Sequence, residues 1–192
     1  MASVRPLSPE DAEAFLKLRL EALREHPAAF SADEADWRSK SVEEAALLLS
    51  GARGSFVLGA FDAEGELVGM AGFQPNDKPK LSHKGILWGM YVTARVRRQG
   101  AGRALVEALL NRARLLPGIR RVNLGVIRTD GGACRLYASA GFQVYGTEPR
   151  SLHYDGTFYD EDLMYFEWED GKTGRRGGCH DIGEEMGLGR PV

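Results

Sequence analysis

The chain has 192 residues, of which 43% are hydrophobic and 27% are charged, and its formal net charge is −2. These values are typical of one globular domain and exclude a disordered, collagen-like or coiled-coil protein. Dedicated nucleic-acid binding needs a large basic excess, which 25 Lys and Arg against 27 Asp and Glu do not provide.

The class of protein is narrowed further by its cysteines, its histidines and the length of its apolar runs. Two cysteines, Cys134 and Cys179, and four scattered histidines offer neither a disulfide framework nor a metal-ligand cluster. No apolar run approaches the roughly 20 residues of a membrane span, and the first residues lack the apolar core of a signal peptide. We therefore expect a cytoplasmic protein with no metal, no membrane and no nucleic-acid partner.

The first half of the chain predicts a strand, two helices and three strands. A short strand around Val4 precedes Ser8-Pro9, which is typical of a helix start because serine caps the helix and proline fits its first position. A second capped helix begins at Ser41. Apolar runs at residues 55–61, 67–73 and 85–92 then predict three strands, the first two joined by a hairpin.

The second half predicts alternating helices and strands, followed by a tail. The expected elements are a helix over 102–116, a strand over 122–127, a helix over 131–140, and strands over 142–145 and 163–168. Seven of the last 22 residues are glycine, too many for a packed element. We expect one α/β domain over residues 1–170 and a mobile tail over 171–192.

A basic loop with two glycines is the most informative stretch. A strand ends near Val92, a helix begins at Gly100-Ala101-Gly102, and four arginines with no acidic residue lie around this turn, at positions 95, 97, 98 and 103. Unpaired N–H groups and the positive dipole end at a helix N-terminus can hold an anion. Glycine lets the backbone approach a phosphate closely because it has no Cβ. The alternative is a solvated basic turn.

Two common phosphate-binding motifs are absent. The Gly-x4-Gly-Lys-Ser/Thr pattern of the Walker loop does not occur, and the dinucleotide fingerprint lacks its third glycine because position 105 is leucine. The sequence therefore gives no motif that would indicate nucleotide hydrolysis or hydride transfer.

The turn resembles a motif of the GNAT superfamily of N-acetyltransferases. Arg97-x-x-Gly100-x-Gly102 after a strand is similar to the superfamily's acyl-CoA pyrophosphate motif, and residues 126–142 are similar to its second signature, which ends Leu-Tyr-x-x-x-Gly-Phe. The resemblance covers residues 2 to about 169. It implies a mixed, mostly antiparallel seven-stranded sheet that is splayed at strands 4 and 5 and has helices on both faces.

The resemblance also implies a cosubstrate, acetyl-CoA or a related acyl-CoA, and the residues that bind it. The backbone of Met90, Tyr91 and Val92 would line the pantetheine arm. The pyrophosphate would lie among Arg97, Arg98, Gln99, Gly100, Ala101, Gly102, Arg103 and Ala104. Asp130, Ala133 and Tyr137 of the second signature would also contact the cosubstrate. Asp130 replaces the family's frequent asparagine, and an ionised carboxylate cannot donate a hydrogen bond.

Acetyl transfer to an amine needs an unprotonated amine and a proton for the departing thiolate. Tyr137 stands at the family's general-acid position, and a phenol stays protonated at neutral pH. It also lies on an apolar helix face, so packing is the alternative. The predicted strand over 85–92 contains no acid to act as base. His83, just upstream, is one candidate because its titration range suits a base. A water chain that ends on a carboxylate such as Glu148 or Asp155 is an equally compatible alternative. Cys134 has no catalytic neighbours, and core packing is the favoured interpretation for it.

The acceptor side is indicated by an acidic, aromatic segment. Eight acids against one arginine lie between residues 148 and 170, and such a surface could attract a cationic amine or be a solvated face. Candidate substrate residues here are Glu148, His153, Asp155 and Tyr159, with Phe30 and Trp37 as the opposite wall.

The prediction is therefore direct transfer of an acetyl group to a primary amine of a small molecule in a ternary complex. The alternatives are a protein N-terminal or lysine acetyltransferase and a non-catalytic acyl-CoA-binding module. An exposed edge at the last strands is compatible with a homodimer.

Overall fold

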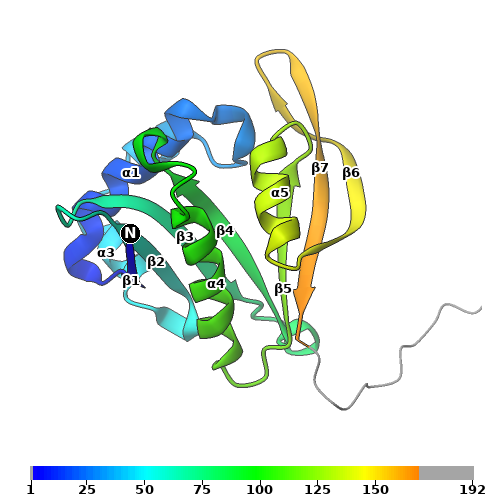
Figure 1. Ribbon diagram of the computed structural model, residues 1–192, viewed down its shortest axis with the longest axis horizontal. Helices are drawn as coiled ribbons and strands as arrows, with labels where there is room; N and C mark the ends of the chain where they lie inside the picture. Colours follow the sequence, from blue (N-terminus) through cyan, green and yellow to red (C-terminus); the bar gives the residue numbers. More distant parts are fainter. Residues whose placement is uncertain (1, 169–192) are drawn as a thin grey trace, which may run out of the picture.

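The computed structural model describes residues 2–168, which form one seven-stranded sheet in the order β1-β2-β3-β4-β5-β7-β6 (Figure 1). Its strands are β1 (Ser3–Pro6), β2 (Phe56–Phe61), β3 (Leu67–Pro75), β4 (Lys84–Val92), β5 (Arg121–Ile127), β6 (Gln143–Tyr154) and β7 (Thr157–Glu167). The sheet is antiparallel except between β4 and β5. The predicted fold class is confirmed.

Helices cover both faces of the sheet (Figure 1). They are α1 (Ala12–Glu25), α2 (Glu34–Arg38), α3 (Val42–Leu49), α4 (Ala101–Arg114) and α5 (Gly131–Ser139). On one face, α4 buries Leu105 and Leu109 completely in a core that also contains residues of α5. On the other face, α1 buries Phe15 in a second core together with α2 and α3. Apolar residues at helical spacing thus account for the two layers around the sheet.

The parallel strands β4 and β5 diverge after only three residue pairs. Pairing runs from Lys84 opposite Arg121 to Ile86 opposite Asn123 and then ends. Further along β4, Gly89 has a φ of 63° at an irregularity in the pairing with β3. This bulge adds one residue and re-aims the side chains that follow it. Met90 consequently faces the α4 side of the sheet, while Tyr91 faces the α1 side.

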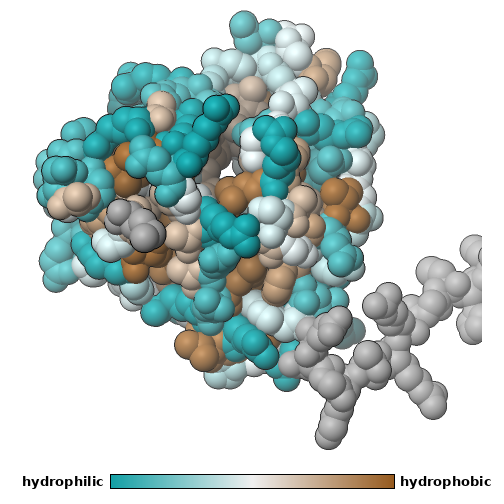
Figure 2. Space-filling model, viewed as in Figure 1, coloured by the Kyte–Doolittle hydropathy of each residue, from teal (hydrophilic) through white to brown (hydrophobic). Residues whose placement is uncertain are grey.

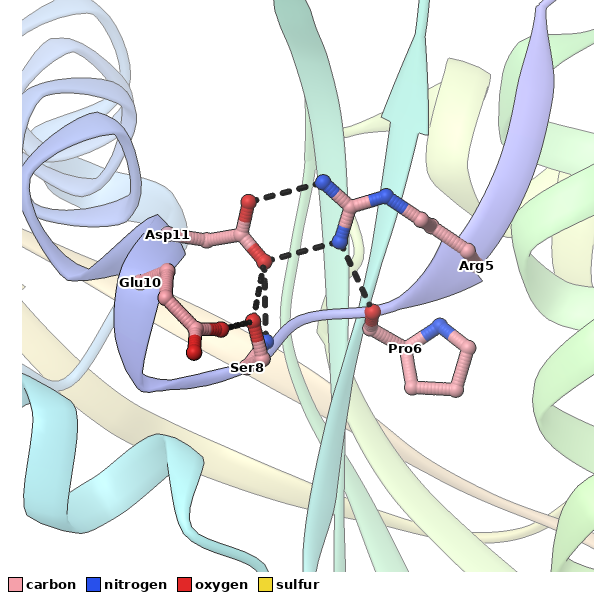
Figure 3. A network of polar contacts seen from close by, with 5 residues as sticks. All are labelled: Arg5, Pro6, Ser8, Glu10 and Asp11. Atoms are coloured by element: carbon pink, nitrogen blue, oxygen red, sulfur yellow. Dashed lines mark hydrogen bonds and ion pairs between the residues drawn. The ribbon is translucent and has the colours of Figure 1, made fainter.

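A compact polar network fixes the entry into α1 (Figure 3). The Arg5 guanidinium donates two 2.8 Å hydrogen bonds to the Asp11 carboxylate, and the Ser8 amide donates a third of 2.8 Å. The Arg5 guanidinium lowers the pKa of Asp11 to about 2, because it favours the ionised carboxylate. The network ties β1 to the start of the first helix.

The structure corrects the predicted bounds of the last two strands. The last two strands are longer than expected and form one hairpin, whose two-residue turn is Asp155-Gly156 with φ values of 47° and 72°. Positive φ at both positions is typical of the tight turn that suits a twisted hairpin. The short helix α2 was not expected. The predicted tail over 171–192 and Cys179 lie outside the described residues. Within residues 2–168, no helix is long and apolar enough to cross a membrane.

Candidate active site

The turn between β4 and α4 has the geometry of an anion-binding site. Arg98 and Gly100 have φ values of 62° and 88°, and Gly100 is the N-cap of α4. The Ala104 amide donates the first bond into the helix, to the Gly100 carbonyl at 3.0 Å. The amides of residues 101–103 precede the first available acceptor, so they remain free to bind an external group.

The four arginines of this turn have different surroundings. Arg95 pairs with Asp62 at 2.8 Å and with Glu66 at 2.7 Å, and Arg103 pairs with Glu107 at 2.7 Å. Arg97 Nε donates to the Val92 carbonyl at 2.8 Å, and its Nη2 lies 2.9 Å from His26 Nε2. Arg98 is exposed and has no acidic partner among residues 2–168. Arg98 is therefore the free cation beside the open amides, whereas Arg97 stabilises the turn.

Gly102 joins three elements at the start of α4. A Cβ here would lie 3.3 Å from Leu136 Cδ2 of α5 and 3.4 Å from Met90 Cε of β4. Both atoms are ends of flexible side chains, so a Cβ at Gly102 would require them to shift by a few tenths of an ångström. At Gly100, by contrast, a Cβ would meet nothing within 4 Å, and this open glycine beside the free amides forms a backbone cradle that fits a pyrophosphate.

The β4 edge beyond the last pair with β5 is open. From Leu87 to Val92, this edge has no strand beside it within the described chain. Met90 and Val92 pack towards α4, and the Tyr91 side chain points to the opposite face. The Tyr91 hydroxyl lies between the carboxylates of Glu21, at 2.9 Å, and Glu25, at 2.8 Å, and shares its one hydrogen with them, which fixes this part of β4 to α1. An extended ligand arm could lie along this edge.

Tyr137 lies on α5, on the same face of the sheet as α4. Its side chain is 5% exposed and packs edge-on against Phe142 at 5.8 Å between ring centroids. Burial, reinforced by the nearby Asp130, raises the pKa of the Tyr137 phenol above its usual value. The phenol therefore stays protonated at neutral pH, as a general acid must.

The residues before Tyr137 organise the start of α5. Asp130 is the N-cap, and its Oδ1 accepts bonds from Gly132 at 3.1 Å and Ala133 at 3.0 Å. This arrangement uses the carboxylate as a helix cap, a role that needs only an acceptor. Cys134 packs against the core, and burial raises the pKa of its thiol, which agrees with a packing role.

A cavity of about 330 Å³ lies at the opening between β4 and β5. Its walls are formed by α1 and the loop after it, by both diverging strands and by the β6–β7 hairpin. The residues that line it include Arg19, Phe30, Trp88, Gly125, Ser151 and Glu161. The space-filling view shows a hollow between the half with α1 and the half with β6 and β7 (Figure 2). Tyr137 lies on the opposite face of the sheet and does not line the cavity.

Arg19 is the buried cation of this cavity. Arg19 is 4% exposed, and its guanidinium carbon lies 4.9 Å from the ring centroids of both Phe30 and Trp37. Burial lowers the pKa of Arg19 to about 10, so the group remains charged at neutral pH. The aromatic faces stabilise the charge through cation–π interactions.

Glu161 is the acid of the same cavity. Its Oε2 accepts a 2.8 Å hydrogen bond from the Ser151 hydroxyl. A Cβ on Gly125 of β5 would lie only 2.0 Å from Glu161 Oε1, so the missing side chain at Gly125 makes room for the carboxylate. The sequence prediction missed Glu161, although it belongs to the acidic segment, because the strand register that sets it over Gly125 has no local signal.

The predicted acceptor residues are only partly brought together. Phe30 lines the cavity, whereas Trp37 is buried behind it against Phe15 and Arg19. The remaining candidates do not line the cavity: Glu148 is exposed, His153 stacks on Phe158, Asp155 lies in the hairpin turn, and Tyr159 is half-buried on β7. The acidic segment thus contributes Glu161 rather than Glu148 or Asp155.

His83, the sequence candidate for the base, does not line the cavity. His83 is exposed, and its carbonyl accepts from the Arg120 and Arg121 amides where β4 and β5 are still paired. At about 3.3 Å per residue of extended strand, it lies roughly 20 Å along β4 from Gly89, where this strand lines the cavity. Such a distance excludes direct proton transfer at the cavity.

Comparisons with known proteins agree with this geometry. The model of the Acetyltransferase (GNAT) family matches residues 14–142, and the chain belongs to that family. It is therefore an acetyltransferase with acetyl-CoA as cosubstrate. A comparison with curated proteins found no match in sequence.

Solved structures show the same fold at low identity. A GNAT-family acetyltransferase from Streptococcus pneumoniae is 24% identical, with a TM-score of 0.78 over 88% of this chain and 100% of that one. The yncA protein of Salmonella typhimurium, solved with its cofactor acetyl-CoA, is 22% identical, with a TM-score of 0.77 over 88% and 95%. A GCN5-related N-acetyltransferase from Kribbella flavida is 26% identical, with a TM-score of 0.74 over 87% and 98%.

Proposed function

We propose that the chain transfers an acetyl group from acetyl-CoA to the primary amine of a small molecule, by direct attack in a ternary complex. The observation that carries this proposal is the cavity of about 330 Å³ at the opening between β4 and β5, with Glu161 on its wall. This volume is near the lower end of ligand pockets and suits a molecule of amino-acid size.

The cosubstrate belongs on the α4 side of the gap. There the free amides of residues 101–103 and the Arg98 guanidinium would hold the pyrophosphate, and the open β4 edge would hold the pantetheine arm. When bound, acetyl-CoA supplies an activated thioester. This division leaves the cavity on the α1 side for the acceptor.

Glu161 and Tyr137 divide the proton transfers between them. Nitrogen forms a bond to the acyl carbon, the carbon–sulfur bond breaks, the amine loses a proton and the thiolate gains one. Glu161 attracts the ammonium form of the acceptor and takes up the proton whose loss makes the amine nucleophilic. The second proton, which nitrogen loses as the amide forms, balances the one that the thiolate gains. Tyr137, protonated because burial raises its pKa, donates the proton to the thiolate.

The test is release of free CoA thiol from acetyl-CoA in the presence of a panel of small primary amines. The proposal expects amine-dependent release, with Glu161→Gln lowering kcat/KM by roughly 10² to 10⁴-fold, the range for a lost acid or base. A Glu148→Gln variant is the matched control, because Glu148 lies opposite Glu161 in the hairpin but is exposed. Acetylation of only folded proteins or of peptide termini would contradict the small-molecule assignment, and no release with any acceptor would favour a non-catalytic module.

A further inference from the structure

The buried donors that lack partners gather at one place. Among residues 2–168, the buried side-chain nitrogens without a hydrogen-bond partner are Arg19 Nε, Arg19 Nη1 and Trp88 Nε1. Both residues line the cavity between β4 and β5. A folded domain normally satisfies such groups internally, so their concentration in a ligand cavity indicates that a ligand supplies the acceptors.

Arg19 is the stronger of the two signals. A buried charge is normally paired with an opposite charge, because desolvation without a partner is costly. The rings of Phe30 and Trp37 contact the guanidinium carbon, but they do not accept the hydrogen bonds that its N–H groups donate in the guanidinium plane. At Gly89 of β4, which also lines the cavity, a Cβ would lie 3.4 Å from Arg19 Nη1, so this nitrogen lies directly beside the backbone of the bulge.

We propose that Arg19 binds an anionic group of the acceptor, so that the acceptor is a small molecule with both a primary amine and a carboxylate or similar oxyanion, as in an amino acid. This inference rests on the proposed function and names its substrate class. Arg19 and Glu161 then give the cavity two opposite charges, one for each end of a zwitterion. A planar guanidinium matches a carboxylate through two parallel hydrogen bonds.

The closing experiment compares amino acids with their primary amides as acceptors. The amide keeps the amine and the side chain, removes the negative charge, and also represents a peptide N-terminus. Because a hydrogen bond to a charged group contributes about 1.5–3 kcal/mol, we expect kcat/KM to be about 10 to 10²-fold higher for the acids. Arg19→Met should abolish this preference, and Arg19→Lys should retain part of it.

Lys17→Met is the matched control, because Lys17 is an exposed cation on the same helix. It should leave the preference for acids unchanged. If Arg19→Met lowers the melting temperature but keeps the ratio of kcat/KM for acid and amide, Arg19 is only structural and the inference is overturned.

A second measurement does not depend on the variants folding. Calorimetry with the unmodified protein and CoA should give tighter binding of an N-acetyl amino acid than of its amide, again by about 10 to 10²-fold. Equal or weaker binding of the acid overturns the inference. If amines are acetylated without preference for acids, only the Arg19 assignment fails; if none is acetylated, the proposed function fails, and the binding comparison still decides the role of Arg19.

Discussion

Replacing Gly125 by alanine would place a methyl group where the Glu161 carboxylate lies. The new Cβ would be 2.0 Å from Glu161 Oε1 and 2.5 Å from its Cδ. Carbon atoms without a bond between them approach to about 3.5 Å, so the carboxylate must move by roughly 1 Å or more. The backbone need not move, because the obstructing atoms belong to the end of a flexible side chain.

The expected loss is therefore catalytic rather than structural. A misplacement of about 1 Å can cost about 10²-fold in rate, which corresponds to roughly 2.7 kcal/mol of transition-state stabilisation. The free energy of unfolding should change little, since alanine in place of glycine commonly contributes about 0.4–1 kcal/mol where the backbone tolerates it. The assay is kcat/KM for the amine by CoA thiol release, beside urea unfolding of the same sample.

Two controls make this prediction strict. Gly146→Ala adds the same methyl group on β6, the outer strand of the hairpin, where the nearest atom, Leu163 Cδ1, is 4.0 Å away, and should leave the rate unchanged. In a Glu161→Gln background, Gly125→Ala should cost much less than it does alone, because both changes act on one group. A folded Gly125→Ala protein with normal kcat/KM would refute the role assigned to Glu161.

Three further predictions concern the acid, the cosubstrate turn and acid stability. Tyr137→Phe should lower kcat by about 10² to 10⁴-fold with little change in acetyl-CoA affinity by calorimetry; normal turnover would leave Tyr137 a packing residue. Gly100→Ala, at a φ of 88°, should cost about 1–2 kcal/mol in urea unfolding and weaken acetyl-CoA binding, and an unchanged stability would contradict the strain. Because Arg5 lowers the pKa of Asp11 to about 2, its contribution to stability is complete above the unfolded pKa of about 3.9 and is lost as the pH falls towards 2; Asp11→Asn should flatten that part of the unfolding profile.

Local signals explain what the sequence could predict. The turn at Gly100 and the apolar periodicity of α4 depend on neighbouring residues only, and the structure has both near the expected positions. The Asp155-Gly156 dipeptide by itself also predicts a turn, because Asp-Gly between two strands is a strong hairpin signal. The sequence pattern around this turn does not predict the two strands, because their residues do not alternate between apolar and polar as in a half-buried strand. In the structure, the apolar residues beside the turn, Tyr154 and Phe158, are exposed.

The cavity itself depends on contacts between distant segments. Arg19 comes four residues after Phe15 and four before Leu23, both buried, so helical spacing places it on the apolar face of α1. This spacing is the sequence feature that indicates a buried position for Arg19. Its lack of a partner, however, is a property of the whole fold. Glu161 reaches the cavity through the pairing of β5 with β7, and its position over Gly125 follows from a register that no local pattern encodes.

The brief contact between β4 and β5 has a thermodynamic consequence. Only three residue pairs join the four-stranded part of the sheet, β1 to β4, to the unit of β5, β7 and β6, in parallel pairing along one end. A cosubstrate arm along the open β4 edge would bridge the two parts, so the chain should unfold at a temperature that rises with acetyl-CoA concentration. For a ligand at 100 times its Kd, mass action stabilises the native state by about 2.7 kcal/mol. Resistance to heat is thus coupled to the supply of cosubstrate.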